Sequence, residues 1–473
     1  MKRIATLVLL LLATSAAFAR EPIKLDPVNP HYFLFRGKPA VLITSGEHYG
    51  AVMNLDFNYV PYLDELERNH LNLTRTFSGA YREVPGNFSI DHNTLAPQPG
   101  RFLGPWIEAN GKFDVTKWNL KFFARLKDFL QQASKRGIVV ELDLFCTFYD
   151  DSMWNVSPMN AKNNVNGIGN VPRAEVYNLE HADLQKVQDA LVRKIVNETR
   201  GFDNLYFEIC NEPYFGGVTL DWQRHISGII VEAEKASGTR HLISQNIGNG
   251  SMKIQNPDPN VSIFNFHYSR PPESVAMNYG LDRAIGNNET GFDGGADATY
   301  RIQGWDFLIS GGALYNNLDY SFTAGHEHGD FVYKPTTPGG GSAALRAQLG
   351  ILHQFVDGFD FANMKPADSV IADGLPEGAS ARVLAEAGKQ YAIYIHHGRV
   401  VKDAKPHYVV DSSEHRARLR LRLPAGSYRA AWFDTKTGRA IGKETFRHSG
   451  GEKTLDSLAY SEDIALEIRS TNL

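Results

Sequence analysis

Short apolar runs alternate with longer amphipathic segments along the first three quarters of the chain. Runs with the length and composition of buried strands lie at residues 41–44, 71–77, 138–145, 204–210, 241–245, 261–267, 283–287 and 313–318. Alternation of such strands with amphipathic helices is typical of parallel βα units, and eight units predict an α/β fold of the (β/α)8 TIM-barrel type. An open doubly wound sheet is the alternative, but no glycine-rich phosphate loop follows the first run.

Two of the intervening segments are periodic enough to predict helices. From Val115 to Ala133, apolar residues recur every three or four positions, with Asp114 as a candidate N-cap and Gly137 as a stop signal. The second segment has an apolar stripe made of Leu184, Val187, Leu191 and Ile195. A hairpin over residues 31–35, with its turn at 36–39, is predicted before the first barrel strand.

The pattern changes near residue 369. Strand-like segments follow one another with little helix between them, at 381–385, 390–396, 415–423, 427–433 and 464–468. We therefore predict a small C-terminal antiparallel β-sandwich. The predicted domains are a barrel with its N-terminal hairpin at residues 20–365 and the sandwich at residues 366–473.

The first residues have the features of a secretory signal peptide. A positively charged start precedes an apolar run over residues 4–13, and a small-x-small pattern ends at Ala19. The run is too short for a membrane anchor, which needs about 20 apolar residues. We predict removal of residues 1–19 by cleavage near Ala19, which gives a secreted or periplasmic protein without membrane attachment.

Composition and charge narrow the function classes. The 473 residues are 42% hydrophobic and 22% charged, as in folded globular proteins, which excludes a disordered chain. The 49 basic and 53 acidic residues nearly balance, so no positive excess indicates nucleic-acid binding. Two cysteines, Cys146 and Cys210, exclude a disulfide scaffold. They end neighbouring predicted strands, where either a disulfide or two buried thiols would fit.

Candidate chemistry comes from the residues that end the strands, because a TIM barrel carries its reactive side chains there. The fourth run leads into Asn211 and Glu212, and the seventh leads into Glu289. The two strands face each other across the barrel mouth, so the two carboxylates can flank one ligand. A helix-start carboxylate before Pro213 is the alternative role of Glu212.

These strand ends resemble those of clan A glycoside hydrolases, which are retaining enzymes on a (β/α)8 barrel. The resemblance rests on Asn211-Glu212-Pro213 after the fourth strand and Glu289 after the seventh, and it spans residues 41–360. It implies that Glu212 is the acid/base, that Glu289 is the nucleophile and that Asn211 binds the sugar 2-hydroxyl. It implies no cofactor and no metal.

Further residues are predicted to bind the sugar. Glu208, inside the fourth run, needs a buried partner, and Arg75 can pair with it and hold Glu289 ionised. The eighth run lacks the tryptophan usual in clan A, and Asn317 or Tyr320 are the candidate replacements. For His267 and Tyr268, structural packing remains the alternative. The predicted substrate-binding residues are Arg75, His48, Tyr49, Asp150, Trp154, Asn211, His267, Tyr268 and Asn317.

Three other features have weaker implications. His326 and His328 alternate on a loop, which is poor metal-ligand spacing. Trp305 is predicted to be a core residue of the helix after the seventh strand. Segments 430–438 and 461–466 resemble the β-sandwich attached to apiosidase-like barrels, a module described as a collagen-binding domain. We expect the sandwich to be a structural companion of the barrel.

The sequence therefore predicts a secreted retaining glycoside hydrolase that acts on poly- or oligosaccharide glycosides. The polar run Glu47-His48-Tyr49 at the first strand end favours exo action on a terminal sugar. A non-catalytic secreted carbohydrate- or matrix-binding protein on the same scaffold is the alternative. An exported esterase is excluded, because no Gly-x-Ser-x-Gly motif is present. The oligomeric state does not follow from the sequence.

Overall fold

The computed structural model describes residues 21–235 and 238–471. The signal peptide predicted over residues 1–19 lies outside this part of the chain. No helix within the described residues has the length and apolar composition needed to cross a membrane. A three-stranded antiparallel sheet, β1 (Lys24–Leu25), β2 (Phe33–Phe35) and β3 (Lys38–Ala40), precedes the barrel and contains the predicted hairpin.

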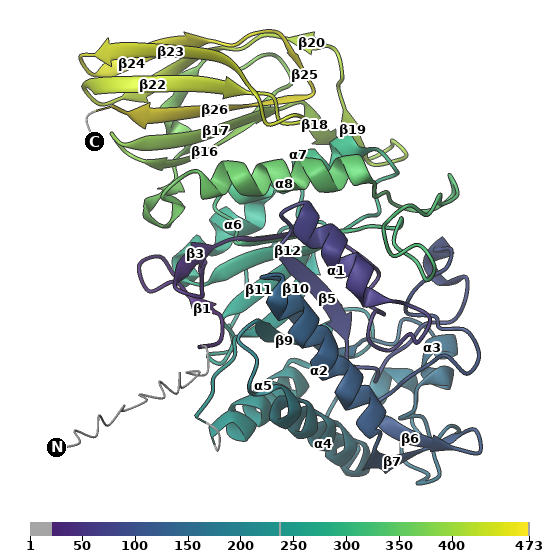
Figure 1. The fold of residues 1–473 in the computed structure, drawn as a ribbon. Helices are drawn as coiled ribbons and strands as arrows, with labels where there is room; N and C mark the ends of the chain where they lie inside the picture. Colours follow the sequence, from purple (N-terminus) through teal and green to yellow (C-terminus); the bar gives the residue numbers. More distant parts are fainter. Residues whose placement is uncertain (1–20, 236–237, 472–473) are drawn as a thin grey trace, which may run out of the picture.

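All eight apolar runs of the first part form parallel strands of one sheet (Figure 1). They are β4 (Leu42–Gly46), β5 (Leu73–Phe77), β8 (Val139–Cys146), β9 (Leu205–Asn211), β10 (Ile243–Asn249), β11 (Ile263–His267), β12 (Ala284–Thr290) and β13 (Leu314–Leu318). The order β4-β13-β12-β11-β10-β9-β8-β5 is that of a (β/α)8 barrel, so the predicted fold is confirmed.

One side chain joins the two end strands of this sheet. Asn72 precedes β5, and its Oδ1 accepts a hydrogen bond of 2.8 Å from the Ile43 amide in β4. Its Nδ2 donates to the Val41 carbonyl at 2.8 Å, and its own amide donates to the Ile43 carbonyl at 3.1 Å. Asn72 thereby closes the barrel between β4 and β5 and satisfies backbone groups that would otherwise be orphaned there.

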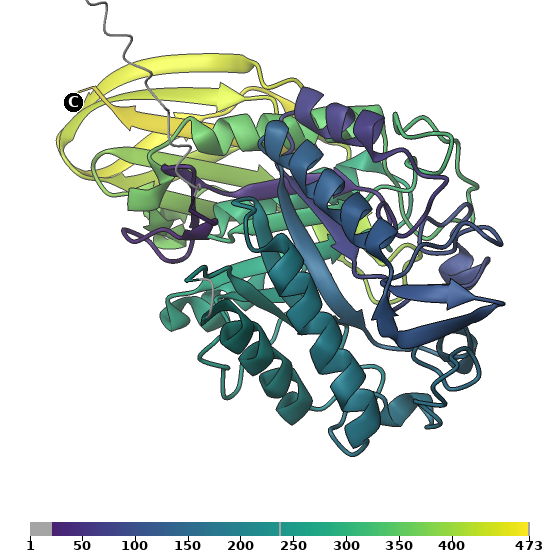
Figure 2. The ribbon, with the colours of Figure 1, turned by 60° about the horizontal axis from the view of Figure 1, so that its bottom comes forward.

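Helices surround the strands, as Figure 2 shows for α2, α4 and α5. The helices are α1 (Tyr59–Arg68), α2 (Leu120–Lys135), α3 (Asp151–Val156), α4 (Ala182–Thr199), α5 (Leu220–Lys235), α6 (Glu273–Asn278), α7 (Asp297–Ile309) and α8 (Ala343–Asp357). The predicted apolar stripe of α4 is buried along its whole length, from Leu184 to Ile195. This burial fixes the face of α4 that packs on the barrel.

The helix predicted over 115–133 is wrong in its first part. A hairpin of β6 (Trp106–Ala109) and β7 (Lys112–Trp118) occupies this stretch, and α2 starts only after Asn119. The Asn119 side chain caps α2 by accepting from the Lys121 amide at 3.2 Å. Phe113 and Val115 are both buried, with the two-residue spacing of a strand. Pairing with β6 therefore overrides the helical spacing that runs through Val115.

The C-terminal part is a β-sandwich, as predicted. One sheet has the order β14-β16-β17-β26-β22-β23 and faces a second sheet, β15-β21-β24. The bounds are β14 (Lys365–Pro366), β15 (Ile371–Asp373), β16 (Ser380–Glu386), β17 (Gln390–His396), β18 (Gly398–Val400), β19 (Tyr408–Val410), β20 (Glu414–His415), β21 (Arg418–Leu423), β22 (Gly426–Phe433), β23 (Ala440–His448), β24 (Gly451–Asp456), β25 (Tyr460–Ser461) and β26 (Asp463–Ser470). Alternate residues of both sheets, such as Ile393 and Leu421, form one apolar core.

The sandwich packs on α7 and α8 of the barrel (Figure 1). Arg301 of α7 forms ion pairs with Glu462 at 2.6 Å and with Asp463 at 2.8 Å. Trp305, fully buried as predicted, stacks on Tyr394 with 5.3 Å between ring centroids. Because α7 follows β12, the strand that carries Glu289, the sandwich packs on the helix next to that strand.

Candidate active site

The two predicted catalytic carboxylates meet at the barrel mouth. Glu212 follows the last residue of β9, and Glu289 lies near the end of β12. One oxygen of each carboxylate and one nitrogen of His267 all lie within 4.8 Å of one another. Both glutamates are nearly buried, with 7% and 6% of their surface exposed. Strands far apart in the sequence thus bring the pair to one point.

A cavity of about 400 Å³ lies above this pair. Of the residues predicted from the sequence, His48, Tyr49, Asn211, Glu212, Tyr268 and Glu289 line it. Its other lining residues are Phe77, Glu83, Phe88, Leu95, Tyr149, Phe215, Asn249 and Phe292. A cavity of this volume is in the range of small-molecule sites, and both carboxylates are among its lining residues.

Three groups hold Glu289 from different strands. Tyr268 donates to its Oε1 at 2.5 Å, and Tyr49 donates to its Oε2 at 2.9 Å. Arg75 adds a longer contact of 3.4 Å to Oε2. Burial alone would raise the pKa of Glu289, but His267, Arg75 and the Tyr268 hydroxyl outweigh it and hold this pKa well below its usual range. Glu289 is therefore an ionised carboxylate, as a nucleophile must be.

Glu212 is held by a different set of donors. The Tyr149 hydroxyl lies 2.5 Å from Oε2, and the Tyr214 hydroxyl lies 3.1 Å from Oε1. The backbone of Glu212 is left-handed, with φ of 47°, and its amide donates to Asn246 Oδ1 at 3.2 Å. A strained backbone held by specific contacts is common at functional sites, because the surrounding structure must fix the side chain in one direction.

His267 connects the two carboxylates. Its Nδ1 lies 3.0 Å from Glu212 Oε1 and 3.4 Å from Glu289 Oε1, and the ring is fully buried. Burial would lower the pKa of His267, but the charges of the two glutamates and the hydrogen bonds to them raise it to about 9. The imidazole is thus a cation at neutral pH and offsets the charge of Glu289.

This geometry predicts a pH-dependent stability. A histidine with a raised pKa in the folded state stabilises fully below its unfolded pKa of 6.5, and the contribution is lost as the pH rises through about 9. We expect the free energy of unfolding to fall by about 2–3 kcal/mol from this source between pH 6 and pH 10. Urea unfolding of wild type and of His267→Gln at both pH values measures it. An equal fall in both proteins would contradict the assignment.

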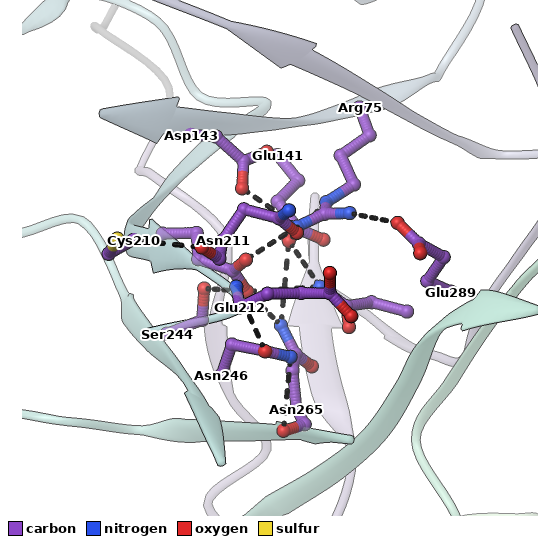
Figure 3. A network of polar contacts seen from close by, with 12 residues as sticks. Arg75, Glu141, Asp143, Cys210, Asn211, Glu212, Ser244, Asn246, Asn265 and Glu289 are labelled. Atoms are coloured by element: carbon purple, nitrogen blue, oxygen red, sulfur yellow. Dashed lines mark hydrogen bonds and ion pairs between the residues drawn. The ribbon is translucent and has the colours of Figure 1, made fainter. Parts of the chain in front are cut away.

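Arg75 organises the polar interior below the mouth (Figure 3). Its Nη2 lies 2.5 Å from Glu208, which confirms the predicted pair, and 2.8 Å from Asn211 Oδ1. The guanidinium carbon stands 4.5 Å from the centroid of the Tyr49 ring. Arg75 therefore fixes Asn211 and Tyr49, and it reaches Glu289 from the interior of the barrel.

Three buried carboxylates share this one cation. Besides Glu208, Glu141 lies 3.0 Å from Arg75 Nε, and Asp143 lies 2.8 Å from Nη2. Burial, followed by the charge of Glu208, raises the pKa of Glu141 to about 8, and burial raises that of Asp143 well above its usual value. Burial of Glu208 is outweighed by Arg75 and by its hydrogen bonds, so its pKa is lowered. Glu141 and Asp143 are thus the neutral members.

Substitutions should separate the neutral carboxyl from the ionised one. Asp143→Asn replaces a neutral acid by a neutral amide, so we expect stability to change by less than about 1 kcal/mol. Glu208→Gln removes the charge that pairs with buried Arg75 and should cost about 3–5 kcal/mol. Denaturant unfolding compares them, and the infrared C=O stretch of a neutral carboxyl should weaken at pH 7 in Asp143→Asn. Equal destabilisation by both changes would contradict the charge assignment.

Three predicted binding residues lie elsewhere. Asp150 caps α3, where its side chain accepts from the Ser152 amide at 2.8 Å. Trp154 is 4% exposed, and its indole nitrogen donates to the Val171 carbonyl at 2.9 Å. Asn317 is fully buried and donates to Ser45 Oγ at 3.1 Å. None of the three is among the residues that line the cavity, so the structure gives them capping and packing roles instead.

Several residues of the site were missed. Tyr149 and Tyr214 contact Glu212 directly, and Glu83 lies 3.5 Å from His48 Nε2. Tyr214 stands two residues after Glu212, so its closeness in the sequence could have identified it as a contact of Glu212. Tyr149 lies in the loop directly after β8, the strand next to β9, so its place could also have been predicted. Glu83 lies in the long loop after β5, where no periodic pattern fixes a side-chain direction.

The two cysteines are free, buried thiols, which decides between the two alternatives left by the sequence. Strand pairing sets Phe145 against Cys210 and Cys146 against Asn211, so the cysteines are offset by one residue. The Asn211 side chain donates to Cys146 Sγ at 3.4 Å. The thiols therefore pack beside the site and help to hold Asn211.

Three clusters within the described residues have ligand atoms close enough to hold a cation. They are Glu175 with Glu180 and His181, Glu212 with His267 and Glu289, and Glu141 with Asp143 and Glu208. In the third cluster the Arg75 guanidinium supplies the positive charge, and in the second the protonated His267 does so. His326, singled out from the sequence, instead pairs with Asp330 at 3.0 Å on an exposed loop.

The architecture is similar to that of solved glycoside hydrolases. A glycoside hydrolase structure superposes with a TM-score of 0.63 at 12% identity, over 96% of this chain and 98% of that chain. A family 5 glycoside hydrolase from Bacteroides vulgatus ATCC 8482 gives 0.62 at 12% identity, over 96% and 94%. An endo-1,4-beta-mannanase from Rhizomucor miehei gives 0.50 at 13% identity, over 72% and 100%.

At these identities the likeness shows the fold alone. The first two structures match nearly the whole chain, so they share the barrel together with the C-terminal part. No protein-family model and no curated protein matches the sequence. The resemblance of the sandwich to a collagen-binding module stays a prediction.

Proposed function

We propose that this protein is a retaining glycoside hydrolase with Glu289 as nucleophile and Glu212 as acid/base. The observation that carries the proposal is that one oxygen of Glu212 and one oxygen of Glu289 lie within 4.8 Å of each other, which brings the two groups close. Inverting enzymes keep their carboxyl groups about 6.5–9.5 Å apart to admit a water molecule, whereas retaining enzymes keep them about 5–5.5 Å apart. The likeness in fold to glycoside hydrolases supports the same reading.

The contacts of each glutamate support its role. Ionised Glu289 attacks the anomeric carbon, while Glu212 gives its proton to the leaving oxygen as the glycosidic bond breaks. A water molecule then attacks the glycosyl–Glu289 ester, with its proton passing to Glu212, and the sugar leaves with its original configuration. We propose that Asn211, which contacts Arg75 at 2.8 Å and the Tyr149 hydroxyl at 2.9 Å, binds the 2-hydroxyl.

We further propose exo action. His48 and Glu83, 3.5 Å apart, supply a charged pair at the cavity wall, which suits the hydroxyls of a terminal sugar. A reducing-end-labelled oligosaccharide should release single sugars from the unlabelled end. Internal cleavage from the first time point would contradict this part of the proposal.

Export and the role of the sandwich are also proposals. The predicted signal peptide is tested by the N-terminal sequence of the protein secreted on expression, which should begin at Arg20. The sandwich is proposed to be a structural companion, because its contacts with α7 support the strand that bears Glu289.

The stereochemical outcome tests the proposed reaction. Wild type is mixed with an aryl glycoside that it hydrolyses, and the first anomer formed is recorded by proton NMR before mutarotation. We expect the anomeric configuration of the substrate. The opposite anomer would contradict a retaining mechanism, and no hydrolysis of any glycoside in a broad panel would favour the non-catalytic alternative.

A further inference from the structure

Four aromatic side chains form a continuous row beside Glu212, and three of them, Phe88, Tyr149 and Phe215, line the cavity. Phe88 lies edge-on to Tyr149 with ring centroids 5.1 Å apart, and Tyr149 lies 6.0 Å from Phe215. Phe215 contacts Tyr214 at 4.9 Å. The row, called here the aromatic row, collects residues from three separate loops, after β5, after β8 and after β9. Such aromatic contacts stabilise each other and present a shared apolar surface.

The aromatic row lies on the Glu212 side of the site. The hydroxyl of Tyr149 donates to Glu212 Oε2, and the hydroxyl of Tyr214 lies between Glu212 Oε1, at 3.1 Å, and Asn249 Oδ1, at 2.5 Å. In the proposed function Glu212 protonates the leaving oxygen, so whatever group departs must pass beside these rings. The Glu289 side carries the polar side chains of His48 and Tyr49 together with Phe292, whose ring contacts that of Tyr268.

The exposed part of the row is mostly hydrocarbon. Phe88 is 38% exposed, Phe215 is 54% exposed and Tyr214 is 36% exposed. The polar atoms of the row are the two tyrosine hydroxyls, and both are engaged with Glu212. A sugar needs hydrogen-bond partners for several hydroxyls, whereas a flat apolar group gains by covering exposed rings.

Backbone features fix both ends of the row. Phe88 and Ser89 are consecutive left-handed residues, with φ of 55° and 60°, a conformation that costs free energy for residues with a side chain. On the other side, a Cβ at Gly216 would lie 1.7 Å from Thr147 Oγ1, so only glycine lets the loop after Phe215 pack this closely. These features constrain the backbone beside the two phenyl groups.

We propose that the aromatic row binds the leaving group of the substrate and selects an aryl group, so that the enzyme releases a sugar from aryl glycosides. This inference rests on the proposed function and narrows it. The sequence alone predicts poly- or oligosaccharide substrates, whereas the row points to an aromatic aglycone. Rigid rings pack on a flat aryl group with little loss of conformational entropy, which a flexible alkyl chain would pay in full.

The test compares three alcohol leaving groups of similar acidity, and a disaccharide is added as the competing substrate class. A panel of 4-nitrophenyl glycosides first identifies the sugar released. For that sugar, kcat/KM is then measured for the benzyl, octyl and methyl glycosides and for a disaccharide. We expect the benzyl glycoside to exceed the methyl glycoside by about 30-fold and to exceed the octyl glycoside and the disaccharide by about tenfold.

Variants link the preference to the row. Phe88→Ala and Phe215→Ala should each lower the benzyl-to-methyl ratio of kcat/KM by about tenfold, and Phe215→Tyr should keep it. Val165→Ala, at a residue 61% exposed and outside the cavity lining, should also keep it. A disaccharide or octyl glycoside cleaved as well as the benzyl glycoside, or a ratio unchanged in both alanine variants, would overturn the proposal.

Failure of the proposed function has a different signature. It would appear as no turnover of any glycoside in the panel by wild type. Calorimetric titration of wild type with benzyl and methyl glycosides then tests the row directly. Binding of the benzyl compound at least tenfold tighter, lost in Phe215→Ala, would support the aryl site. Equal binding of both compounds would overturn it.

Discussion

Glu289→Ala should lower kcat/KM for aryl glycosides by about 10⁴-fold or more, the scale seen when a covalent nucleophile is removed. The space left by the carboxylate lies on the face of the sugar opposite the leaving group. Azide can enter it and attack the anomeric carbon, which gives a glycosyl azide of inverted configuration. The activity regained with azide and the configuration of the product, read by NMR, measure the effect.

Two controls make this result specific. Glu108 is an exposed glutamate on β6, and Glu108→Ala should keep the wild-type rate with no response to azide. The lost carboxylate also held Tyr49 and Tyr268, so the fold of Glu289→Ala needs a check. Its circular dichroism spectrum should match that of wild type. Turnover of Glu289→Ala within tenfold of wild type would show that another group is the nucleophile.

The loss caused by Glu212→Ala should depend on the leaving group. A poor leaving group needs its oxygen protonated, so its glycoside should lose about 10²–10⁴-fold, the usual contribution of general acid catalysis. A dinitrophenyl glycoside needs no proton and should form the glycosyl–enzyme at close to the wild-type rate. Pre-steady-state release of dinitrophenol measures that step.

The second step gives an independent readout of the same variant. Without Glu212 as base, the glycosyl–enzyme should hydrolyse slowly and accumulate, and azide should release it as a glycosyl azide of retained configuration. The opposite configurations from Glu212→Ala and Glu289→Ala would separate the two roles. An equal loss for good and poor leaving groups would contradict the acid/base assignment.

Much of the fold was readable because each barrel strand is a buried apolar run bounded by polar residues. The register of those runs was enough to place Glu212 and Glu289 at the same mouth, since parallel strands share their carboxyl end. His267 and Tyr268 could be predicted for the same reason. Each of these residues stands at the end of a barrel strand, and a barrel strand can be recognised from its run of apolar residues.

The errors have physical causes of their own. The spacing of Val115 and the later apolar residues suits a helix, but the backbone of this stretch forms its hydrogen bonds with β6 instead. Trp154 follows the end of β8, but it lies on the short helix α3, which turns it away from the barrel mouth. Phe88 and Glu83 come from the long loop after β5, whose path depends on tertiary contacts that no local pattern records.

The interior network around Arg75 shows the limit of pairwise reasoning. The pair with Glu208 was predicted because a buried carboxylate needs a partner. Glu141 and Asp143 belong to the same network, but as inward-facing residues of a strand with a buried apolar pattern they give no sign of it. A cation shared by several carboxylates is recognised only when the strands are assembled.

Trapping of the glycosyl–enzyme tests the central claim most directly. A 2-deoxy-2-fluoro glycoside with a dinitrophenyl leaving group slows both steps, the second more than the first, so the covalent intermediate accumulates. After proteolysis, tandem mass spectrometry should find one added sugar on the peptide that contains Glu289, at that residue. The sugar on Glu212 or on any other residue, or an inverted product formed without an adduct, would contradict the account.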